Sequence, residues 1–97
     1  MEIRIQSTNF DAAEHLRTHI EKRVSKLEKL CDGVPVADIV LKVVKPETER
    51  NKDAQIRIKT DNGEFFASKT ADSFEQAADE CAEAVEKQIL KAKEKRH

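Results

Sequence analysis

Hydrophobic and polar residues alternate along three short stretches of this chain, and a period of two is typical of β-strands that bury one face. The first stretch, residues 2–7, places Ile3 and Ile5 on one face and charged or amide side chains on the other. Residues 36–45 and 53–60 show the same alternation and are rich in the β-branched residues that favour strands. The pattern therefore predicts three strands that share one core.

The sequence DNGE follows the third of these strands and predicts a β-hairpin. Asn62-Gly63 suits a two-residue type I′ turn, because both central positions of that turn require positive φ. Such a turn places Lys59 opposite Phe66. On this register Phe65 faces the core, whereas Phe66 lies on the open face of the sheet beside Lys59.

Between residues 12 and 31 the apolar residues return every three or four positions, which predicts a helix with one apolar face. That face consists of Ala13, Leu16, Ile20, Val24, Leu27 and Cys31. Asp11 and Glu14 fit a capping box at the start of this helix, with Phe10 as its hydrophobic staple. Gly33 is expected to cap its C-terminus.

The same spacing predicts a second helix from residue 74 to about residue 94. Its apolar stripe consists of Phe74, Ala78, Cys81, Val85, Ile89 and Ala92. Either Ser73 with Gln76 or Asp72 with Glu75 can cap this helix.

The predicted element order is therefore β-α-β-β-β-α. A strand, a helix and a second strand most simply form a right-handed parallel crossover, and the two following connections are short enough for antiparallel pairing. Two helices with one apolar stripe each would cover one face of a four-stranded sheet. The expected fold class is α+β, a two-layer sandwich, and 97 residues fit a single domain, residues 1–97.

The overall charge of the chain says little about its function, so the distribution of charged residues along the predicted elements matters more. Lys and Arg number 18 and Asp and Glu number 19, so the net charge is −1 and any nucleic-acid binding depends on clustering. At about 100° per residue, one stripe of the first helix holds only bases: His15, His19, Lys22, Lys26 and Lys29. Two interpretations stay open. The stripe is either a solvated face or a ridge that faces phosphates, whose negative charge offsets the repulsion among the cations.

The second helix carries acids in its first half and bases at its end, an order that the helix dipole alone would favour. The bases exceed what a helix end needs, and the open sheet face adds Lys42, Arg57 and Lys59. Basic clusters on three elements predict a strong local field in a nearly neutral chain.

Five segments occur in an order and spacing that resemble the short ribosome hibernation factors, a family that includes hibernation promoting factor and ribosome-associated inhibitor A. The segments are HLRTHIEKRVSKLEK, VLKVVK, NGEFFAS, DSFEQAADE and EKQILKAKEK. The resemblance covers almost the whole chain. It implies a β-α-β-β-β-α fold similar to double-stranded-RNA-binding domains, in agreement with the order derived from periodicity.

The resemblance also implies a function. Members of this family bind the small ribosomal subunit, with its 16S rRNA, in the channel for messenger RNA and transfer RNA, and they silence translation in stationary phase or stress. The chain ends at His97, so we expect a short member without the further C-terminal domain by which long members dimerise ribosomes. We expect a cytoplasmic protein that is a monomer when free and needs no cofactor.

The residues that the resemblance assigns to RNA binding are Arg23, Lys26, Lys42, Lys45, Lys87, Lys91, Lys93 and Lys95. The basic stripe of the first helix adds Lys22 and Lys29. Lys and Arg contact phosphates without reading sequence, so specificity would have to come from the shape of the rRNA.

Other functions find less support in the sequence. Asp11, His15 and His19 share a helix face and could hold a metal, but no fourth ligand is evident. Cys31 and Cys81 are expected to be small buried thiols. Without a Gly-rich phosphate loop or a nucleophile elbow, catalysis is not expected. The alternative functions are a general double-stranded-RNA-binding module or a protein-interaction module.

Overall fold

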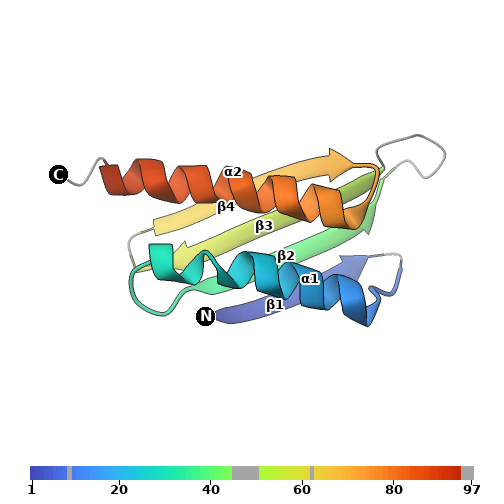
Figure 1. Ribbon diagram of the computed structural model, residues 1–97, viewed down its shortest axis with the longest axis horizontal. Helices are drawn as coiled ribbons and strands as arrows, with labels where there is room; N and C mark the ends of the chain where they lie inside the picture. Colours follow the sequence, from blue (N-terminus) through green and yellow to red (C-terminus); the bar gives the residue numbers. More distant parts are fainter. Residues whose placement is uncertain (9, 45–50, 62, 95–97) are drawn as a thin grey trace.

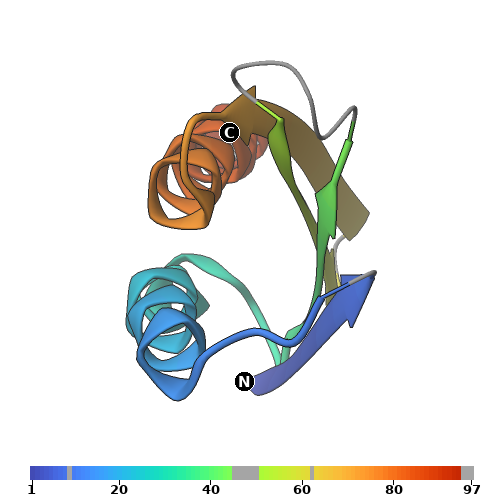
Figure 2. The same cartoon turned by 90° about the vertical axis from the view of Figure 1, so that its right-hand side faces the viewer.

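The computed structural model describes residues 1–8, 10–44, 51–61 and 63–94. Its sheet has four strands and is covered on one face by two helices (Figures 1 and 2). The elements are β1 (Glu2–Thr8), α1 (Glu14–Ser25), the 3-10 turn η1 (Glu28–Leu30), β2 (Val36–Val43), β3 (Lys52–Thr60), β4 (Gly63–Ala71) and α2 (Phe74–Glu94). This arrangement confirms the predicted α+β two-layer sandwich.

The strands lie in the order β1-β2-β3-β4. β1 pairs with β2 in parallel, and the other two pairs are antiparallel, as the element order predicts. β1 and β4 therefore run in the same direction, and each is followed by a helix that returns along the sheet. As a result both helices run the same way, and their C-terminal ends lie at the same end of the molecule (Figure 1).

The core lies between the sheet and the helices and is built from the inward-facing residues of both layers. The largest fully buried side chains are Ile20, Val24, Leu27, Pro35, Ile39, Leu41, Ile56, Ile58, Cys81 and Val85. Each Ile, Leu or Val that leaves water on folding contributes about 1.5–3 kcal/mol, so this layer holds the helices on the sheet.

α1 is shorter than the predicted helix of residues 12–31, because its final hydrogen bonds tighten to a three-residue spacing. The N–H of Leu27 donates to Val24 O at 2.9 Å, and the N–H of Leu30 donates to Leu27 O at 3.0 Å. The α-helix thus ends at Ser25, and the chain continues into η1. The apolar stripe survives this change, since Leu27 remains fully buried.

The capping box and the staple predicted for α1 are wrong. Ala13 is the N-cap, and no side chain of the described residues caps the helix there. Phe10 stacks instead on Phe74, the first residue of α2, with the two ring centroids 4.5 Å apart. Phe10 therefore joins the loop before α1 to the start of α2, and both Asp11 and Glu14 stay exposed.

The sequence predicts that Gly33 caps the first helix, but the residue that caps α1 is Lys26. Gly33 lies between η1 and β2 with a φ of 75°, in the left-handed region. A Cβ atom at this position would collide with the carboxylate of Asp61. The Asp61 side chain is exposed and could move aside, so it is the positive φ that favours glycine at this position.

The hairpin register differs from the predicted one by two positions. Lys59 pairs with Glu64 rather than Phe66, and Thr60 pairs with Gly63. The Thr60 Oγ1 donates to Gly63 O at 3.0 Å, so Gly63 belongs to the strand rather than to the turn. The other predicted turn residue, Asn62, lies outside the described residues.

The cap and the apolar stripe predicted for α2 are confirmed at most positions. The N–H of Gln76 donates to Ser73 Oγ at 3.1 Å, which is the first of the two predicted caps. The stripe is buried from Phe74 to Ile89, and Ala92 is half-buried.

Gln88 of α2 binds the outer edge of β4. Its Nε2 donates to Phe66 O at 2.7 Å, and its Oε1 accepts the Phe66 N–H at 3.2 Å. Both backbone groups of this edge residue are therefore satisfied by one side chain.

The two cysteines differ in burial. Cys81 is fully buried, as predicted, and its thiol donates to Ala67 O at 3.1 Å. Cys31 is only half-buried, because it follows η1 at the margin of the core. Burial raises the pKa of the Cys31 thiol, and burial raises the pKa of the Cys81 thiol to about 11.

Leu27→Ala is expected to lower the free energy of unfolding by about 2–5 kcal/mol, because a fully buried side chain would leave a cavity. Leu27→Met conserves the volume and should cost less than about 1.5 kcal/mol. Urea unfolding followed by circular dichroism checks both values. A Leu27→Ala protein as stable as Leu27→Met would contradict the packing described for this turn.

At pH 8 a Cys81 thiol with a pKa of about 11 is ionised to only about 0.1%, compared with roughly a quarter for a free cysteine. Native Cys31→Ser protein should therefore react very slowly with an aromatic disulfide reagent, while Cys81→Ser protein keeps a measurable reaction. Both should react fast in urea. Rapid reaction of native Cys31→Ser protein would show that Cys81 is accessible.

The same shift has a consequence for stability. The folded state holds the Cys81 proton up to about pH 11, whereas an unfolded thiol releases it near about pH 8.5. The folded state thus binds more protons in this window, so the free energy of unfolding should fall as the pH rises through it. Cys81→Ala protein has no thiol at this position, so its free energy of unfolding should fall less between pH 8 and 10.5 than that of the unchanged protein. Urea unfolding midpoints measured across this pH range check the difference.

Candidate nucleic-acid interface

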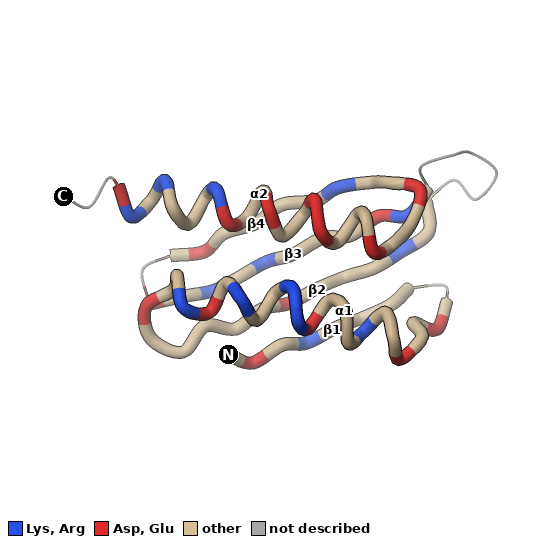
Figure 3. The backbone as a smooth tube through the Cα atoms, in the orientation of Figure 1, with Lys and Arg blue, Asp and Glu red and all other residues tan. Residues whose placement is uncertain are grey.

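Seven of the ten predicted RNA-binding residues lie on the helical layer, toward the end where both helices finish (Figure 3). We call them the helix-end cluster, and they are Lys22, Arg23, Lys26 and Lys29 from α1 and η1, and Lys87, Lys91 and Lys93 from α2. Arg23 and Lys93 are half-buried, and the other five are exposed. The parallel helices thus bring together cations that are about 60 positions apart in the sequence.

The cluster is basic because each helix changes composition along its length. Residues 21–29 hold four cations and two Glu, and residues 85–94 hold three Lys and two Glu. The first part of α2, residues 74–84, holds four acids and no Lys or Arg. Both C-terminal ends also carry the negative pole of a helix dipole, which favours cations there.

Few of these cations are neutralised by a neighbouring carboxylate. In the described part of the chain, the one ion pair that involves a member of the cluster joins Lys87 Nζ to Glu83 Oε1 at 3.4 Å. An exposed pair of this kind contributes at most about 0.5 kcal/mol and leaves the ammonium available to a phosphate.

The open face of the sheet does not extend this cluster. Its cations alternate with acids: Arg4, Lys42, Arg57 and Lys59 lie among Glu2, Asp38, Asp53 and Glu64. Arg57 Nη1 lies 3.5 Å from Glu64 Oε1, and Lys42 pairs across the sheet with Asp53. The expectation that three elements share one basic field is therefore wrong, and Lys42 lies on the opposite layer from the helix-end cluster.

Two further predicted residues, Lys45 and Lys95, lie outside the described residues. Their positions relative to the cluster stay predictions from the sequence.

A shallow groove of about 340 Å³ between α1 and α2 brings both signs of charge together. Its lining residues are His19, Arg23 and Lys26 from α1 and Asp79, Glu80 and Glu83 from α2. His19 Nε2 lies 3.0 Å from Asp79 Oδ1. The Oε2 atom of Glu80 is buried and has no hydrogen-bond partner among the described residues.

Sequence reasoning missed these three acids as neighbours of the cluster. Their position in the first half of α2 looked like a complement to the helix dipole. Which face of α2 meets α1 depends on how the helices pack, and periodicity gives only the apolar face.

The metal site considered for Asp11, His15 and His19 finds no support in the geometry. His19 contacts Asp79, and the side chain of His15 is exposed. Within residues 1–8, 10–44, 51–61 and 63–94, no group of three or more His, Cys, Asp or Glu side chains is placed to hold a metal ion.

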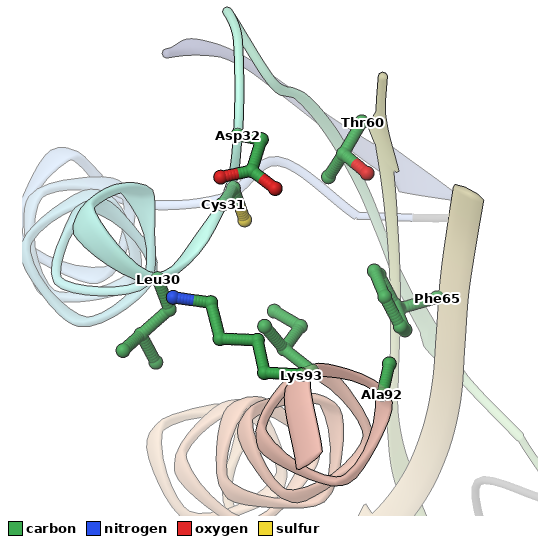
Figure 4. A pocket seen from close by; sticks show the side chains of 8 residues that line it. Leu30, Cys31, Asp32, Thr60, Phe65, Ala92 and Lys93 are labelled. Carbon is green, nitrogen blue, oxygen red and sulfur yellow. The ribbon is translucent and has the colours of Figure 1, made fainter. Parts of the chain in front are cut away.

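A small cavity of about 40 Å³ lies beside the cluster, between η1, the β3–β4 hairpin and the last turns of α2 (Figure 4). Phe65, Ile89 and Ala92 form an apolar wall, and the Lys93 side chain extends across the opening toward Leu30. The cavity has room for a few water molecules.

Phe66 lies on the open face, as predicted, and is 43% exposed. Because a register shift of two residues leaves each side chain on its face, Phe65 still packs against the core. The neighbour of Phe66 is Arg57 rather than Lys59, with the guanidinium carbon 5.1 Å from the ring centroid. The ring of Phe66 therefore packs against the guanidinium of Arg57 in a cation–π contact.

Several solved structures share this fold, and two of them illustrate the similarity to this chain. The N-terminal domain of Protein Y from Thermus thermophilus superposes with a TM-score of 0.82 at 20% identity, covering 95% of this chain and 99% of that one. A ribosomal subunit interface protein from Coxiella burnetii gives a TM-score of 0.81 at 19% identity, covering 96% and 98%. No curated protein matches the sequence significantly.

Within the described residues, neither helix combines the length and the apolar composition needed to cross a bilayer.

The family model described as sigma 54 modulation protein / S30EA ribosomal protein matches residues 3–97. This match confirms the resemblance drawn from the five sequence segments. Since it spans nearly the whole chain, the protein belongs to the sigma 54 modulation protein / S30EA ribosomal protein family.

Proposed function

We propose that this protein binds the small ribosomal subunit through the helix-end cluster, occupies the channel for messenger RNA and transfer RNA, and thereby silences translation in stationary phase or stress. The observation that carries the proposal is the helix-end cluster, present in a member of a ribosomal protein family. The name of the Coxiella burnetii protein, a ribosomal subunit interface protein, supports the same class of partner. The protein would act in the cytoplasm, where ribosomes work.

The proposed mechanism is occlusion rather than catalysis. The exposed ammonium and guanidinium groups contact rRNA phosphates and release condensed counterions, which supplies affinity without sequence reading. The rigid two-layer shape then selects a pocket of matching form, as is usual for structured RNA. Lys42 would form a second contact from the open face of the sheet, and Lys45 and Lys95 stay predicted RNA-binding residues from the sequence.

Lys87, Lys91 and Lys93 offer the sharpest test, because they lie on one helix and are accessible to solvent. Changing all three to Gln should weaken binding to purified small subunits about 10- to 100-fold. It should also lower the slope of log K against log salt by about 2–3, since up to three phosphate contacts are lost. Sedimentation or fluorescence anisotropy at several salt concentrations measures both quantities.

The matched control is Arg4→Gln/Arg57→Gln/Lys59→Gln, which removes the same charge from the open face of the sheet. This control should stay within about threefold of the unchanged protein, because its cations lie among acids. Equal losses in both triple variants would show that bulk charge, not the cluster, governs binding.

The unchanged protein also separates the proposal from its alternatives. A silencer binds small subunits more tightly than a plain RNA duplex and competes with transfer RNA. Equal affinity for duplex and subunit would indicate a general double-stranded-RNA-binding module. Binding to neither would indicate a protein-interaction module.

A further inference from the structure

The helix-end cluster has an acidic border on its own layer. Arg23 and Lys26 line the groove between the helices, and the opposite wall of that groove consists of Asp79, Glu80 and Glu83. Any polyanion that covers Arg23 and Lys26 and spreads across the groove therefore meets three carboxylates. Negative charge at this border opposes the binding of phosphates beside it.

These acids contribute little to the stability of the helix. The favourable effect of the helix dipole on acids fades beyond the first turn, and Asp79 and Glu83 lie further along α2, which begins at Phe74. The pair of Glu83 with Lys87 is exposed, and such pairs are weak. In the described residues, none of the three forms an ion pair with Arg23 or Lys26 within 4 Å. The carboxylates thus lie beside these cations without binding them.

Because these three acids lie beside Arg23 and Lys26, they influence which RNA the helix-end cluster can bind. Repulsion between a carboxylate and a phosphate acts over about 8 Å at physiological salt, so these acids repel phosphates that enter the groove they line. Non-specific RNA binding depends almost wholly on phosphates, so it is the mode most penalised by a nearby row of acids. Proteins often select one binding partner by placing groups that repel the other candidates.

We propose that Asp79, Glu80 and Glu83 are specificity-determining residues, which repel RNA surfaces that spread phosphates across both helices and favour one that leaves the first half of α2 uncovered. This inference rests on the proposed function, because it concerns which RNA the helix-end cluster accepts. A regular duplex presents phosphates continuously and is rejected. A folded rRNA pocket with a gap opposite the acids is accepted.

The test compares two double variants that remove the same charge. Asp79→Asn/Glu83→Gln neutralises the groove, and Asp11→Asn/Glu14→Gln neutralises two exposed acids near the start of α1, at the opposite end of that helix from the cluster. Dissociation constants are measured for a plain RNA duplex of about 20 base pairs, longer than the roughly 16 that a duplex-binding domain spans. The same proteins are then titrated against purified small subunits.

The groove variant should bind the duplex about three- to tenfold more tightly than the control variant, which corresponds to roughly 0.7–1.4 kcal/mol. Its affinity for small subunits should change less than twofold, so its preference for subunit over duplex falls. Glu83→Gln alone, which keeps the contact between His19 and Asp79, should show part of the gain. Urea midpoints verify that each variant is folded.

Equal duplex affinity of the groove and control variants would overturn this inference and leave the proposed function standing. An equal gain for duplex and subunit would also overturn it, because the acids would then lower affinity without selecting. Failure of the unchanged protein to bind small subunits would instead overturn the proposed function. That outcome comes from the titration of the unchanged protein against subunits, which is separate from the comparison of the two variants on the duplex.

Discussion

The parallel pairing of β1 with β2 is the constraint on which the rest of this structure depends. It makes β1 and β4 run in the same direction, and each of these strands is followed by a helix that must return along the same face. The two helices therefore run side by side in one direction (Figure 1). An antiparallel β1 would reverse α1 and carry its basic end away from that of α2.

Much of this fold follows from periodicity alone. Alternating residues such as Ile3 and Ile5 locate strands, and the spacing from Leu16 to Val24 locates a buried helix face. What periodicity could not give is local hydrogen bonding. α1 ends early because Leu27 donates to Val24, and the hairpin register is set by how Thr60 meets Gly63. These choices leave the apolar pattern unchanged, so the pattern contains no sign of them.

The candidate site shows a similar division. The exposure of Lys87 and Lys91 could be read from the helical pattern, since neither residue belongs to the apolar stripe of α2. The position of Lys42 beside Asp53 could not be predicted from the sequence pattern, because Asp53 lies on another strand and its partner depends on the strand register. Nor could the sequence place Asp79 beside His19, since that contact depends on how two helices meet. The sequence thus predicted which charged residues share one face of a helix or strand. It did not predict which acids from other elements lie beside those cations.

The contact of Gln88 with the backbone of Phe66 has a consequence for self-association. An exposed sheet margin is a template on which a second molecule can add a strand and begin fibril growth. At β4 the carboxamide of Gln88 already occupies the hydrogen-bonding groups of one residue midway along the margin, so an incoming chain would have to displace it. Gln88 therefore hinders the addition of an intermolecular strand at this point of β4.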